Sequence, residues 1–77
     1  MPTVVRLGNI KIVIYAADHN PPHFHLLSSE HAAIVSIETL EITSGFVPRQ
    51  VYEVATRWAV DHMDLLRETW TRLNERD

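Results

Sequence analysis

The chain has 77 residues, of which 45% are apolar and 22% are charged, and this balance excludes an intrinsically disordered protein. It has no cysteine, which excludes disulfide bonds and thiolate ligands, so any metal site would use histidine and carboxylate side chains. The formal net charge is −3 with no basic cluster, which disfavours general DNA binding, and the lack of a long apolar run or a signal-peptide pattern predicts a soluble, cytoplasmic protein.

Four short runs rich in apolar and β-branched residues occupy the first half of the chain, at residues 4–7, 10–15, 24–28 and 32–37. Between the first two runs, Gly8 and Asn9 have the composition of a two-residue hairpin turn. The pattern predicts a three- to four-stranded antiparallel meander sheet. Residues 40–45 are either a further short strand or a connector.

After Pro48 the hydrophobic period changes to the spacing of one helical face. A single helix over residues 48–75 would be about 40 Å long, which is long for a chain of this size. We therefore expect two consecutive helices with a break near residues 61–64, where Asp61 or Asp64 could cap the second one, and one kinked helix is the alternative. The predicted fold class is α+β, with a single domain over residues 1–77.

The segment from residue 18 to residue 25 reads Asp-His-Asn-Pro-Pro-His-Phe-His and holds three of the five histidines. Its two adjacent prolines restrict the backbone and stiffen the loop. His23 and His25 are two residues apart on the predicted strand, so their imidazoles point to the same side. Such a pair can act as a general acid and base, contact a phosphate, or bind a metal if Asp18 or His19 supplies a third ligand.

A purely structural role for these histidines is the alternative, since such side chains also hydrogen-bond to loop carbonyls. Strand alternation places Phe24 on the side covered by the helices, so His23 and His25 are expected to face away from them. His62 lies on the helical stripe and is expected to be a buried, hydrogen-bonded side chain. It would then lie on the opposite side of the sheet from His23 and His25, which disfavours a site with three histidines. The two tryptophans at helical spacing, Trp58 and Trp70, are expected in the core.

Several segments together carry a resemblance to a known family: residues 1–3 and the strand after them, the segment 18–25, the strand 33–37, Pro48-Arg49, and Trp58-Ala59 with His62. On these segments the chain resembles a family of very short bacterial proteins, domain of unknown function 4160. Members of that family are commonly encoded beside a second small protein, in an arrangement like toxin–antitoxin operons. The resemblance implies a toxin bound by its neighbour.

The leading hypothesis is a toxin-like component of a bacterial type II toxin–antitoxin module, which acts on RNA or a nucleotide phosphate by histidine acid/base chemistry without a metal or other cofactor. The candidate catalytic residues are Asp18, His19, His23 and His25. The candidate binding residues are Arg6, Lys11, Asn20 and His62. A non-enzymatic protein-binding module and a metal-dependent hydrolase that uses the same loop are the alternatives. An unpaired strand edge predicts association, as a homodimer or with a small antitoxin-like protein encoded alongside.

Overall fold

A five-stranded antiparallel sheet is followed by two helices in the computed structural model, which describes residues 3–74. The elements are β1 (Thr3–Leu7), β2 (Ile10–Val13), β3 (His23–Leu27), β4 (Ala32–Ser36), β5 (Ile42–Phe46), α1 (Arg49–Val60) and α2 (Met63–Asn74). The strands lie in the sheet in the order in which they occur in the chain, so every strand pairs with its sequence neighbour. The predicted α+β class and the meander are confirmed.

The number of strands differs from the prediction of three to four, because residues 42–46 form a fifth strand, β5. All five residues of β5 are exposed, so burial gives the strand no alternating apolar pattern. Its pairing with β4 stabilises it instead, across an irregularity between Ile34 and Val35. Gly45 has φ +83°, and a Cβ at this position would meet the carbonyl oxygen of Ala32. Only glycine fits this close approach of the two strands without strain.

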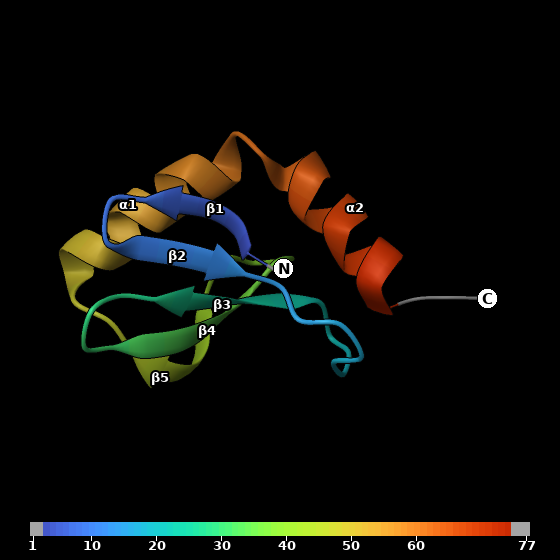
Figure 1. Cartoon of the computed structure of the whole chain (residues 1–77), viewed down its shortest axis with the longest axis horizontal. Coiled ribbons are helices and arrows are strands. Elements are labelled where there is room, and N and C mark those ends of the chain that lie inside the picture. The colour runs from blue at the N-terminus through green and yellow to red at the C-terminus, as the bar shows by residue number, and fades with distance from the viewer. Residues whose placement is uncertain (1–2, 75–77) are drawn as a thin grey trace.

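The core lies between one face of the sheet and the two helices (Figure 1). Phe24 and Leu26 of β3 are fully buried, which confirms the predicted alternation of this strand. The other buried core residues are Ile10, Ile12, Ile14, Ala33, Val35, Ile37, Val47, Ala55, Ala59, Leu66 and Trp70. Of the two predicted anchors, Trp70 is 1% exposed and Trp58 packs at the margin of the core. None of the described helices is long and apolar enough to cross a membrane.

The helical part is broken at Asp61 and His62, within the predicted region. Asp61 is the C-cap residue of α1, and Asp64 lies in the first turn of α2. The His62 ring stacks on Trp58 at a centroid distance of 4.1 Å, and its Nδ1 lies 2.7 Å from the Trp58 carbonyl oxygen. His62 is therefore hydrogen-bonded at the helix junction, as the sequence predicted, but it is half-buried and not buried.

Candidate functional site

The connection between β2 and β3, residues 14–22, is anchored to the last residue of α2. The side-chain nitrogen of Asn74 donates to the carbonyl oxygen of Tyr15 at 3.0 Å, and its side-chain oxygen accepts a hydrogen bond from the backbone N–H of Asp18. The peptide bond between Asn20 and Pro21 is cis. The two hydrogen bonds of Asn74 hold the loop at a defined position relative to α2, which follows much later in the chain.

Asp18 points from this loop toward the two histidines of β3. Its Oδ2 lies 2.9 Å from Nε2 of His23 and 3.4 Å from Nε2 of His25. One ligand atom from each of the three residues lies within 4.8 Å of the other two. The side chains of His23, Asp18 and His25 are 14%, 24% and 25% exposed, so the cluster is largely buried yet open to a small molecule. We refer to these three residues as the Asp–His–His cluster.

Aromatic side chains hold both imidazoles in place. The His23 ring lies 5.0 Å from the Trp70 ring, and the His25 ring meets Tyr15 edge-on at 4.7 Å. The contact with Trp70 corrects the expectation that both histidines face away from the helices. Although β3 turns His23 toward the other face of the sheet, α2 passes close enough to the start of this strand for Trp70 to reach the ring.

The hydrogen bonds of the cluster define its charge state. Burial alone would raise the pKa of the Asp18 carboxyl, but hydrogen bonds from the His19 backbone N–H and from the two imidazoles outweigh this effect and hold its pKa below the ordinary value of 3.8. Asp18 is therefore ionised at neutral pH. Nδ1 of His23 lies 2.9 Å from the carbonyl oxygen of Pro21, which can only accept, so this nitrogen carries a hydrogen. Nδ1 of His25 has no hydrogen-bond partner among residues 3–74.

A pocket of about 400 Å³ opens over the cluster. It is lined by Asp18, His19, Asn20, Pro21, Pro22, His23, His25, Ile34, Ser36 and Thr43. The loop forms one wall, and β3, β4 and β5 form the rest. The pocket therefore combines one carboxylate and several imidazoles with small hydroxyl and apolar side chains, which is the usual composition of a ligand site.

The predicted site residues divide into three groups. Three of the four catalytic candidates come together in the cluster, while His19 contributes its backbone N–H to Asp18 Oδ1 at 3.0 Å and lines the pocket. Of the binding candidates, Asn20 lines the pocket. The others are outside its lining, with Arg6 and Lys11 opposite each other on β1 and β2 and His62 at the helix junction.

Four contributors were missed by the sequence analysis: Ser36 and Thr43 in the pocket wall, Ile34 beside them, and Asn74 behind the loop. Thr43 belongs to the strand whose existence the pattern left open. No sequence signal marked Asn74, since an asparagine at a helix end is ordinary.

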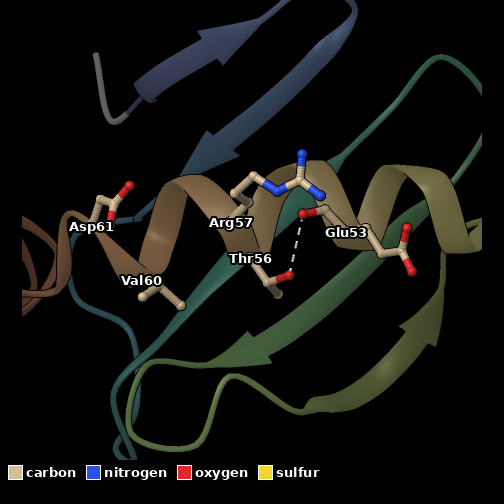
Figure 2. Close-up of a pocket in the computed structure, with 5 residues that line it drawn as sticks. All are labelled: Glu53, Thr56, Arg57, Val60 and Asp61. Atoms are coloured by element: carbon tan, nitrogen blue, oxygen red, sulfur yellow. Dashed lines mark hydrogen bonds between the residues drawn. The ribbon is translucent and has the colours of Figure 1, made fainter.

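A second hollow lies along α1 and has a different character (Figure 2). It is lined by Glu53, Thr56, Arg57 and Val60 of α1 and by Asp61, the C-cap residue of that helix. The Thr56 hydroxyl donates to the backbone carbonyl of Glu53, as the dashed line shows. These side chains do not converge on one point, so the hollow has no arrangement of groups that would act on a ligand.

Comparison with known proteins agrees with the resemblance seen in the sequence. The family model described as a domain of unknown function (DUF4160) matches residues 9–71, which is most of the chain. The chain belongs to the DUF4160 family. The DUF4160 match includes the whole Asp–His–His cluster and ends before Asn74. No curated protein and no solved structure matches the chain.

Proposed function

We propose that the pocket over β3 is a hydrolytic active site in which the Asp–His–His cluster activates a water molecule. The observation that carries the proposal is the convergence of Asp18, His23 and His25 on one point beside a pocket large enough for a substrate group. A carboxylate and imidazoles in a concave, partly apolar site are the usual means of moving protons without cysteine or serine. The substrate class that we assign is a phosphate ester of RNA or of a nucleotide.

The roles of the two histidines differ in this proposal. Both ring nitrogens of His23 face protein oxygens, from Pro21 and from Asp18, so this side chain orients the carboxylate and carries positive charge in its protonated form. His25 is oriented by Asp18 through Nε2, and its Nδ1 has no partner in the described part of the chain. His25 is thus the side chain better placed to exchange a proton with water or substrate.

We further propose that this activity belongs to a toxin-like protein of the bacterial cytoplasm that a small antitoxin-like protein holds inactive. The support is the two-gene arrangement that the resemblance implies, together with the edge strand β5, whose five residues are exposed and uncharged. An uncharged edge strand readily pairs with a strand of another chain. The same edge supports the second candidate, a binding module without catalysis.

Growth arrest and hydrolysis separate these two candidates. The chain is induced in a bacterial host without its genomic neighbour, and the purified protein is assayed on a fluorogenic single-stranded RNA and on bis(p-nitrophenyl) phosphate. We expect His25→Ala and Asp18→Asn to abolish both effects. His31→Ala is the matched control, because His31 packs against Phe46 outside the pocket. Growth arrest that survives His25→Ala would leave the binding module as the better proposal.

Association is measured by sedimentation of the protein alone and with its genomic neighbour. The proposal expects a dimer or a complex at tens of micromolar, weakened by Ser44→Lys, which introduces a charge into β5. A protein that stays monomeric in both experiments would remove the partner from the proposal and leave an autonomous enzyme.

A further inference from the structure

We infer that Asp18, His23 and His25 hold a divalent transition-metal ion, with Zn²⁺ as the representative probe, and leave at least one coordination position open toward the pocket. The inference deepens the proposed function, on which its catalytic meaning rests, because the ion would be the group that activates water. Binding of the ion itself depends only on the geometry of the three side chains.

Two of the three separations between ligand atoms in the cluster are close to those found around such an ion. Zinc binds imidazole nitrogen and carboxylate oxygen at about 2.0–2.2 Å in tetrahedral geometry, which places neighbouring ligand atoms roughly 3.4 Å apart. The separation of Asp18 Oδ2 from His25 Nε2 is 3.4 Å, and its separation from His23 Nε2 is 2.9 Å. The third pair, formed by one ring nitrogen of each histidine, lies within 4.8 Å.

The hydrogen bonding of His23 points to the same conclusion. Because its Nδ1 donates to the Pro21 carbonyl oxygen, a neutral His23 presents the lone pair of Nε2 to the carboxylate of Asp18. Two acceptors would then face each other at 2.9 Å, which is unfavourable unless a proton on His23 or a metal ion lies between them. A metal ion supplies that positive charge when His23 is neutral. Metal-binding histidines usually donate their second N–H to a carbonyl or a carboxylate in this way.

The composition of the cluster selects the class of ion. Two nitrogens and one carboxylate oxygen suit Zn²⁺ and its first-row neighbours, whereas Ca²⁺ and Mg²⁺ prefer oxygen ligands alone. Three protein ligands with an open fourth position are typical of catalytic zinc sites, while structural sites have four. The open position would face the pocket of about 400 Å³.

The charges that line the pocket indicate what a metal ion would contribute to substrate binding. No lysine or arginine is among the described residues that line it, whereas the carboxylate of Asp18 is part of the lining. A phosphate ester would therefore meet a carboxylate and no lysine or arginine side chain at the cluster. A divalent ion reverses the local charge from −1 to +1, attracts the anionic group and lowers the pKa of a bound water toward neutrality.

Titration of the tag-free full-length protein with ZnCl₂ after dialysis against EDTA tests the inference, since a histidine tag would itself bind the ion. We expect one saturable site per chain, at least a tenfold loss of affinity in His25→Ala and in Asp18→Asn, and no change in the His31→Ala control. Circular dichroism of each variant shows that it is folded, and Asp18→Asn, which nearly preserves shape, remains informative if His25→Ala is not. The visible absorption of bound Co²⁺ reports the coordination by nitrogen and oxygen.

Two results would overturn the inference: the absence of stoichiometric binding to the wild-type chain, or equal affinities in His25→Ala and His31→Ala. The first result would leave a protonated His23 paired with Asp18 as the explanation of their contact. If hydrolysis persists in EDTA and depends on His25, the proposed function stands and the metal inference falls. If one zinc binds through the cluster and neither phosphate substrate is cleaved, the metal site stands and the proposed function falls.

Discussion

The side chain of Asn74 accepts a hydrogen bond from the backbone N–H of Asp18, although 56 residues separate the two in the chain. The same side chain donates to the carbonyl oxygen of Tyr15. Asp18 in turn aims its carboxylate at both histidines of β3. The last residue of α2 therefore positions a carboxylate of the site without touching the pocket itself, since Asn74 is not part of the pocket lining.

Replacement of Asn74 by alanine should loosen the loop and weaken the site together. Two hydrogen bonds are lost, each worth about 1 kcal/mol in a partly exposed setting, so we expect the free energy of unfolding to fall by roughly 1–2 kcal/mol. Zn²⁺ affinity should fall about tenfold, as is typical when an outer partner of a ligand is removed. Urea denaturation and metal titration measure the two effects. The control is Arg72→Ala, on an exposed position of the same helix. Equal metal affinities in both variants would mean that the loop holds its position without Asn74.

The two histidines of the cluster should differ in their effect on stability. His23 packs against Trp70 and donates to Pro21, so His23→Ala is expected to cost about 1–2 kcal/mol, whereas His25→Ala should cost less than about 1 kcal/mol. Leu26→Ala removes a fully buried core side chain of the same strand, and its expected loss of roughly 2–5 kcal/mol in the free energy of unfolding is the reference for the other two. Denaturant midpoints of the three variants test this order. An unfolded His25→Ala protein would show that its imidazole is part of the fold.

Acid stability of the metal-free protein should depend on Asp18. The pKa of this carboxyl is lower in the folded chain than its ordinary value of 3.8, so the group stabilises the fold above about pH 4, and this contribution is lost as the pH falls through the folded-state pKa. The wild type should therefore lose more stability below pH 4 than Asp18→Asn does. Thermal melts in EDTA between about pH 2 and pH 7 measure the difference. Parallel curves for the two proteins would show that the hydrogen bonds to this carboxylate do not form in solution.

The two glycines provide a matched pair for the fifth strand. Both have positive φ, but a Cβ at Gly45 would collide with the backbone of Ala32, whereas a Cβ at Gly8 would meet open space. Alanine at Gly8 should cost about 1 kcal/mol for backbone strain alone, and alanine at Gly45 should cost at least about 2 kcal/mol because β5 must move away from β4. Chemical denaturation compares the two. Similar costs at the two positions would place β5 farther from β4 than described.

Most of the fold could be predicted because the relevant signals are local. Residues 10–13 are rich in β-branched side chains, and residues 23–27 alternate between buried and half-buried positions. The stripe after Pro48 repeats at helical spacing. The break between the helices was predicted because a single helix over residues 48–75 would be too long for this chain, and the structure confirms the break. Strand β5 could not be predicted with the same certainty, because it is defined by pairing and by a glycine contact, and neither leaves a hydrophobic pattern in the sequence.

The three residues of the Asp–His–His cluster could be predicted from the sequence, but the residues that position them could not. Asp18, His23 and His25 lie within one short segment, and strand geometry alone places the two imidazoles on the same side. Nothing in the sequence favoured Asp18 over His19 as the third member of the cluster. That choice depends on the path of the loop, which Asn74 and the contact between His23 and Trp70 determine from a distant part of the chain.

The order of the strands has a consequence for the assembly of the protein during synthesis. Each strand pairs with the one made just before it, so the sheet can grow hairpin by hairpin as the chain leaves the ribosome. The loop that carries Asp18 emerges early but gains its anchor only when residue 74 has been made and α2 has docked. The pocket over the Asp–His–His cluster therefore takes its final shape only after α2 has docked.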